Sequence, residues 1–243
     1  MQYMLIAPEE QMDFGFGITA ESYYHSANFL FDNQEHLGFH QQKEAPTNYL
    51  YRHSIELFLK SLIILFHKKL KISYQNESYE SKKPIIFING QWRPLYKCHW
   101  INGLFCYWLD DLYLKHEAKI KQMAPNGDWS VPEDVMKLFE KIKIYDTESD
   151  YFRYPITTNT HRDYEKYDMR KIDLNEKKNL FIRKNEEESK KIYLLYEGKN
   201  EEIVGGYVSK DNVLEDIKVA LREVSNYLYC VHTMTRMTLF EGK

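Results

Sequence analysis

The segment from Asn48 to Lys69, NYLYRHSIELFLKSLIILFHKK, carries ionisable side chains at intervals in an otherwise apolar stretch. At about 100° per residue on an α-helix, these side chains fall within one arc about 100° wide. They are Arg52, His53, Glu56, Lys60 and His67. Because an unpaired charge in a protein core is costly, the arc is either a set of internal ion pairs or the wall of a polar cleft.

The spacing within this arc supports both interpretations. Arg52 and Lys60 each lie four residues from Glu56, so the three side chains can form ion pairs along one face of a helix. In a functional cleft, Glu56 would act as acceptor or base, Lys60 and Arg52 would bind an anion, and His53 would carry a proton. A role in self-association is the third interpretation.

Helical periodicity predicts a mainly α protein with a bundle of about four long helices. Thr19 can cap the first helix, Pro46 suits the first turn of the second, and Asp211 can cap the last. Ser130 and Glu133 have the spacing of a capping box. The expected helical segments are 19–33, 46–70, 99–121, 130–146 and 211–237.

Two other segments are predicted to contain β-structure. The sequence PIIFINGQWRPL, within residues 84–96, has Asn89 and Gly90 between two strand-like runs, which is typical of a type I′ hairpin. Between about residues 156 and 208, charged runs separate the strand-like segments NLFIR, KIYLLYE and IVGGYV. We expect a small, irregular or β-rich insertion there, within a single domain spanning residues 1–243.

Composition narrows the class of protein. The chain has 243 residues, is 43% hydrophobic and 15% aromatic, and has 33 basic against 36 acidic side chains. This balance predicts a globular protein with no general attraction to nucleic acid or membranes, so such a partner would need a local basic patch. Three widely spaced cysteines favour a reducing, cytoplasmic location, and we expect no membrane span, metal site or cofactor.

Three segments together resemble the uncharacterised bacterial branch of the HEPN-like helical proteins. They are NYLYRHSIELFLKSLII, then KCHWINGLFCYWL, which has a histidine at the start of a helix, then DTESDYFRYP. The resemblance covers residues 48–65, 97–112 and 146–155, and Trp100 stands where the family usually has an acid. It implies a helical bundle, frequently a homodimer, and singles out Arg52, His53, Glu56, Lys60, His99, Arg153 and Tyr154.

Many HEPN proteins are metal-independent ribonucleases that use an arginine and a histidine four to six residues apart. Arg93 and His99 have this spacing, but Pro94 lies between them at the exit of a predicted hairpin, whereas the nuclease motif is expected around a helix terminus. A spacing of this kind also arises by chance in a chain of this composition. Another one-turn pair, His232 and Arg236 near the C-terminus, is more typical of the edge of a core than of a ligand site.

The main functional hypothesis is a HEPN-like protein that binds RNA or a phosphate-bearing nucleotide in a polar cleft, in stress response or mobile-element defence. Its ligand-binding residues would be Arg52, Glu56, Lys60, Arg153 and Tyr154. The alternatives are a metal-independent ribonuclease, with His53 or His99 as catalytic candidates, and a non-catalytic adaptor bundle. A homo-oligomer is expected in each case.

Overall fold

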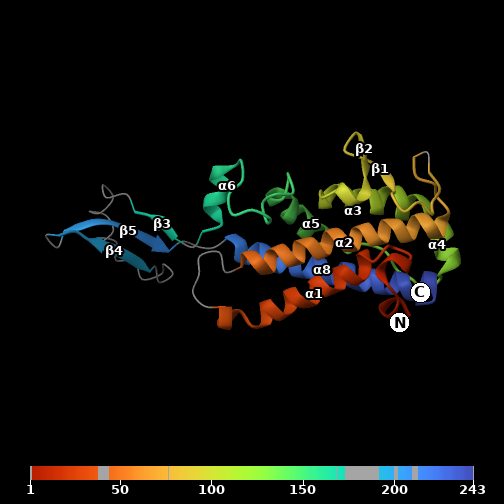
Figure 1. Cartoon of the computed structure of the whole chain (residues 1–243), viewed down its shortest axis with the longest axis horizontal. Coiled ribbons are helices and arrows are strands. Elements are labelled where there is room, and N and C mark those ends of the chain that lie inside the picture. The colour runs from red at the N-terminus through yellow and green to blue at the C-terminus, as the bar shows by residue number, and fades with distance from the viewer. Residues whose placement is uncertain are drawn as a thin grey trace.

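The computed structural model describes residues 2–37, 44–75, 77–167, 169–172, 192–199, 202–209 and 213–242. The chain is mainly helical, as predicted. Its core is built on two long helices, α2 (Ala45–Leu70) and α8 (Val213–Phe240), which pack against each other with α1 (Phe16–Asp32) alongside (Figure 1). Almost every residue of α2 from Tyr51 to His67 is buried, because neighbouring elements surround this helix.

α1 begins earlier than predicted, and Thr19 lies inside it rather than capping it. Gly15 precedes the helix with a φ of 80°, a left-handed conformation that suits glycine. The Asp13 carboxylate accepts hydrogen bonds from the backbone N–H groups of Gly15 and Gly17, at 3.3 and 2.8 Å. An upstream carboxylate therefore caps the first turn. The second helix contains Pro46 in its first turn, as predicted.

The predicted third helix is one helical run in three parts: α3 (Ile101–Cys106), a π-helical stretch (Tyr107–Leu114) and α4 (Lys115–Met123). His99 lies in the segment before it, so the prediction that the helix begins at His99 was wrong by two residues. Gly103 fits here because a Cβ would lie 2.0 Å from the Trp100 ring. Trp100 therefore packs directly on the first turn of α3.

α5 (Glu133–Tyr145) packs against α8, and its start differs from the predicted capping box. Pro132 is the N-cap, and no side chain caps the helix. Ser130 lies two residues before this N-cap, where its backbone N–H donates to Asp128 Oδ1 at 2.9 Å. The proline sets the entry of the chain into the helix, so Ser130 is too far upstream to act as a cap.

The predicted hairpin is present as β1 (Ile85–Ile88) and β2 (Gln91–Pro94), which pair antiparallel. Asn89 and Gly90 have φ values of 51° and 71°, as a type I′ turn requires. The chain continues through a short 3-10 helix, Leu95–Lys97, towards His99. Tyr96 and His99, which follow the hairpin, contact side chains of α2.

The region predicted as an insertion contains a second small sheet, with order β3-β5-β4, in which β5 (Ile203–Ser209) pairs antiparallel with β3 (Met169–Lys171) and β4 (Tyr193–Glu197). This sheet extends beyond one end of the bundle, opposite the chain termini (Figure 1). The strand-like predictions at 193–197 and 203–208 are confirmed, and a short helix, α6 (Thr160–Glu165), was not predicted. The NLFIR segment and Asp211 lie outside the described residues.

Further short 3-10 helices occur at Gln2–Leu5, Pro8–Glu10 and Gln34–Leu37. In the described part of the chain, no helix combines the length and apolar character needed to cross a membrane.

Candidate functional site

One carboxylate on α2, that of Glu56, accepts hydrogen bonds from four side chains. Its Oε1 accepts from Lys60 Nζ at 2.8 Å and from His99 Nδ1 at 2.9 Å. Its Oε2 accepts from Arg52 and, at 3.3 Å, from Arg153 Nη2. Glu56 therefore joins two residues of its own helix to one residue before α3 and one residue after α5.

Arg52 extends this network in two further directions. Its Nε donates to Asp146 Oδ2 at 2.9 Å, at the end of α5, and its Nη2 donates to the backbone carbonyl of His99. Lys60 Nζ similarly donates to the Tyr96 carbonyl at 3.1 Å. The two cations of α2 thus fix the backbone of residues 96–99, which explains why this segment is held against the helix.

The inner part of the network is enclosed, since Arg52, Glu56, Lys60 and Asp146 are each 2% exposed or less. Burial alone would raise the pKa of Glu56, but Lys60 and Arg52 outweigh this effect and hold that pKa well below its usual range. Burial lowers the pKa of Lys60 and raises the pKa of Asp146, although each lies beside an opposite charge. Counting Arg153, three cations face two carboxylates, so the network has an excess of one positive charge.

His99 is the part of the network most open to solvent, with its side chain 44% exposed. A carboxylate can only accept a hydrogen bond, so the 2.9 Å contact with Glu56 assigns the ring proton to Nδ1. In the neutral imidazole this leaves Nε2 as the nitrogen able to accept a proton. A buried carboxylate that orients a histidine in this way is the arrangement of a general base and its positioning residue.

A cavity of about 460 Å³ opens beside His99. It is formed by the hairpin turn, the segment that follows the hairpin, the end of α5 and the residues after α5. Its cationic lining residues outnumber its single carboxylate, that of Glu148. The cations, which we call the basic rim, are Arg93, Lys97, Lys143 and Arg153.

Some charges of the basic rim have partners of their own. Lys143 Nζ lies 3.1 Å from Glu140, in a pair whose side chains are 44% and 62% exposed. Arg93 donates to the side chain of Gln91 at 2.7 Å, which leaves its charge uncompensated in that contact. Lys97 lies 5.7 Å from the centre of the Tyr96 ring. A mobile anion could compete with these exposed contacts because each is weak in water.

The segment YFRYP, residues 151–155, is held in place by α6 and the residue that follows it. Lys166 is buried and donates to the Tyr154 carbonyl at 2.9 Å and to Asp163 at 2.8 Å. Asp163 in turn accepts hydrogen bonds from the backbone and hydroxyl of Thr157. These contacts fix the backbone just after Arg153, whose side chain reaches Glu56.

The structure gathers Arg52, Glu56, Lys60, His99 and Arg153 in one network but places the other predicted residues elsewhere. His53 stacks on Tyr49, with ring centres 5.7 Å apart, and meets Tyr23 edge-on. Burial lowers the pKa of His53. The Tyr154 residue is 56% exposed and lines a different cavity.

His67 also lies apart from the Glu56 network. Its Nδ1 is 2.8 Å from the Ile72 carbonyl and its Nε2 is 3.0 Å from the Tyr107 hydroxyl. Its pKa is lowered to about 4, chiefly because the imidazole is buried. His67 therefore connects the end of α2 to the π-helical stretch instead of facing the basic rim.

Asp146, Lys97 and Lys143 belong to the site but are not among the residues predicted from the sequence. Asp146 is the first residue of the DTESDYFRYP segment, and an acid near the start of that segment was the available signal. Lys97 and Lys143 are ordinary surface lysines in the sequence. The folding of the chain alone brings them to one cavity.

A second buried polar cluster joins the segment before α1 to α2 and α8, and we call it the closed cluster. Asp13 pairs with Arg236 at 2.6 Å, accepts from Ser61 and lies 3.8 Å from His232. Each of these four residues is 0% exposed. Contacts with His232, Arg236 and Ser61 outweigh the effect of burial and lower the pKa of Asp13.

Among the described residues, no group of three or more His, Cys, Asp or Glu side chains could hold a metal ion. Comparisons of this chain with protein-family models, curated proteins and solved structures found no match. The candidate site therefore rests on its own geometry.

Proposed function

We propose that this protein binds a phosphate-bearing ligand, RNA or a nucleotide, at the basic rim. The observation that supports the proposal is the gathering of Arg93, Lys97, Lys143 and Arg153 around one cavity with a single lining carboxylate. Phosphate oxygens accept hydrogen bonds from arginine and lysine, which makes such a cavity chemically suited to them. The resemblance to HEPN-like proteins in residues 48–65, 97–112 and 146–155 supports the same class of ligand.

In this proposal the predicted ligand residues divide into two roles. Arg153 and His99 face the ligand, together with the other cations of the basic rim. Arg52, Glu56 and Lys60 are buried and hold the backbone of residues 96–99, so they position the site from behind. The excess positive charge of the network adds to the field at the cavity, because two of its members line that cavity.

Calorimetric titration with inorganic pyrophosphate and with a short oligoribonucleotide at low salt tests this proposal. Lys97→Gln and Lys143→Gln should each weaken binding about five- to ten-fold, and added salt should weaken it further. Lys137→Gln is the matched control: Lys137 lies on α5 like Lys143, is 73% exposed and does not line the cavity. The proposal would be contradicted if neither pyrophosphate nor the oligoribonucleotide bound, or if Lys137→Gln lost as much affinity as the two test variants.

A ribonuclease is the second candidate function, favoured by one further observation. Arg93 and His99, which have the spacing of the HEPN nuclease pair, line the same cavity. His99 Nε2 would take the proton of a ribose 2′-hydroxyl, and Arg93 would stabilise the charge that develops on the phosphate. Attack of the 2′-oxygen on phosphorus would form one P–O bond and break the bond to the 5′-oxygen. The departing 5′-oxygen would take up a proton from water, which leaves a 2′,3′-cyclic phosphate and a 5′-hydroxyl.

Incubation of labelled RNA with the protein in excess chelator tests this second function. Cleavage should be lost in His99→Ala and kept in His36→Ala, because the His36 side chain is 74% exposed and lies outside the cavity. A His53→Ala variant distinguishes the two predicted catalytic histidines. If RNA stays intact while pyrophosphate binds, the protein is a binding protein and not a nuclease.

A further inference from the structure

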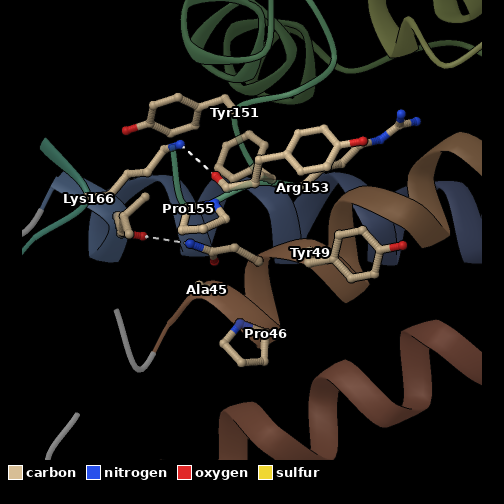
Figure 2. Close-up of a pocket in the computed structure, with 11 residues that line it drawn as sticks. Ala45, Pro46, Tyr49, Tyr151, Arg153, Pro155 and Lys166 are labelled. Carbon is tan, nitrogen blue, oxygen red and sulfur yellow. Dashed lines mark hydrogen bonds between the residues drawn. The ribbon is translucent and has the colours of Figure 1, made fainter. Parts of the chain in front are cut away.

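A second cavity, of about 250 Å³, lies between the first turns of α2, the YFRYP segment, Lys166 and the start of α8 (Figure 2). Its lining includes four aromatic side chains, those of Tyr49, Tyr151, Phe152 and Tyr154. Typical sites for drug-sized ligands measure about 300–1,000 Å³. This aromatic cavity is smaller and therefore suits a planar fragment about the size of a nucleobase.

Two of the aromatic residues can offer a surface for stacking. Tyr49 is half-buried and lies parallel to His53, with an interplanar angle of 11°, so this pair already forms a short stack. The Tyr154 residue is 56% exposed. Tyr151 and Phe152 are buried and also line this cavity. Planar bases stack on tyrosine rings with little regard to sequence.

Asn48 lines the cavity, and its side-chain oxygen has no donor among the described residues. This asparagine is 0% exposed. Its Nδ2 is already engaged with the Leu214 carbonyl, at 3.4 Å, which fixes the orientation of the amide. A buried acceptor without a donor is unfavourable. A ligand with an N–H group at its edge would satisfy it.

Arg153 lines both this aromatic cavity and the cavity of the basic rim. In Figure 2, Arg153 and Tyr49 lie on one side of the aromatic cavity, and Lys166 and Tyr151 lie on the other. The lysine donates to a backbone carbonyl of the YFRYP segment and so holds the far wall. A ligand that stacked on Tyr49 would therefore have its polar end next to Arg153.

We infer that the aromatic cavity binds the base of a nucleotide whose phosphates lie at the basic rim, with an N–H group of the base donating to Asn48. This inference rests on the proposed function and adds the recognition of a base to it. A free nucleotide and the 5′-phosphorylated end of an RNA share this chemistry. Adenine, which carries an amino group, serves as the test base.

The experiment compares three ligands by calorimetry: pyrophosphate, ADP and purine riboside 5′-diphosphate. ADP should bind at least about ten-fold more tightly than pyrophosphate, because a stacked base adds to the phosphate contacts. Purine riboside diphosphate, which lacks the amino group of adenine, should fall between them. Displacement of ADP by a 5′-phosphorylated trinucleotide would assign RNA ends to the site as well, and its absence would restrict the site to free nucleotides.

Two variants locate the base. Tyr49→Leu should reduce the affinity for ADP about ten-fold and leave that for pyrophosphate unchanged, whereas Tyr49→Phe keeps the ring and should match the wild type. Equal affinities for pyrophosphate and ADP would overturn the inference and leave the proposed function intact. If neither pyrophosphate nor ADP binds, the inference fails, and if the oligoribonucleotide does not bind either, the proposed function fails with it.

Discussion

The Glu56 network and the closed cluster are both buried ion-pair groups that include residues of α2, yet only the Glu56 network reaches the surface. Around Asp13, all four side chains, including Ser61, His232 and Arg236, are 0% exposed. Around Glu56, His99 and Arg153 extend from the buried carboxylate to a cavity, and their side chains are 44% and 23% exposed. The same chemistry can therefore serve stability alone in one place and present a charged surface in the other.

The location of the two groups in the fold explains this difference. The closed cluster links the segment before α1 to the packed helices α2 and α8, and all four of its side chains are buried. The Glu56 network instead joins α2 to irregular segments, residues 96–99 and 146–153, which leave space between them. Irregular segments on a rigid helix are common positions for binding residues.

The largest effect on the free energy of unfolding is expected from Arg236→Gln in the closed cluster. This change leaves the Asp13 carboxylate buried without its 2.6 Å partner, and breaking a buried ion pair typically costs about 3–5 kcal/mol. Urea denaturation should show this loss in the free energy of unfolding. Pyrophosphate binding by the protein that remains folded should be unchanged. A small loss of stability would mean that the closed cluster is not the stabilising device that its burial indicates.

An intermediate effect on stability is expected from protonation of His67. This residue lies in the same arc of ionisable side chains on α2 but belongs neither to the Glu56 network nor to the closed cluster. Its pKa is about 4 in the folded protein against an ordinary value of 6.5, so between these values the unfolded chain binds a proton that the folded protein does not. Stability from this residue is therefore complete above about pH 6.5 and falls as the pH drops towards 4, by about 3 kcal/mol. Denaturation curves measured across this range should show the loss.

His67→Gln is the matched variant for that measurement. Glutamine can donate to the Ile72 carbonyl and accept from the Tyr107 hydroxyl, but it does not titrate. The variant should lose less stability than the wild type between about pH 6.5 and pH 4. Parallel curves for the two proteins would show that other groups cause the acid sensitivity.

The parts of the site that could be predicted from sequence are the local ones. Arg52, Glu56 and Lys60 lie four residues apart, so the helical repeat alone places them together. The 100° spacing wrongly grouped His67 with them, because the angle around a helix ignores position along its axis. His67 lies seven residues beyond Lys60, which corresponds to about 10 Å along the helix. His53 points to tyrosines of α1 and α2 instead.

The remaining parts depend on contacts between distant segments. Asp146 meets Arg52 across 94 residues, and the pairing of Asp13 with Arg236 spans nearly the whole chain. No local pattern specifies such pairs. The fold followed the same rule: the hairpin turn at Asn89 and Gly90 was predictable because its backbone conformation is local, whereas the start of α1 depended on the upstream carboxylate of Asp13.

The smallest effect on stability is expected from Arg153→Gln, the counterpart of the Arg236 variant in the open network. Arg153 is partly exposed and lies 3.3 Å from a carboxylate that keeps Arg52 and Lys60, so its removal should cost no more than about 1 kcal/mol. Its effect should appear instead as weaker binding of pyrophosphate, by about ten-fold, because a cation is lost from the cavity wall.

The two arginine variants together distinguish a ligand-binding role of the Glu56 network from a purely structural role. If Arg153→Gln destabilises the protein as much as Arg236→Gln and leaves pyrophosphate affinity unchanged, the Glu56 network and the closed cluster are both structural. That outcome would favour the non-catalytic adaptor bundle. If Arg153→Gln unfolds at the same urea concentration as the wild type but binds pyrophosphate more weakly, the exposed end of the Glu56 network binds the ligand. The buried cations Arg52 and Lys60 would then act through the backbone of residues 96–99 that they hold.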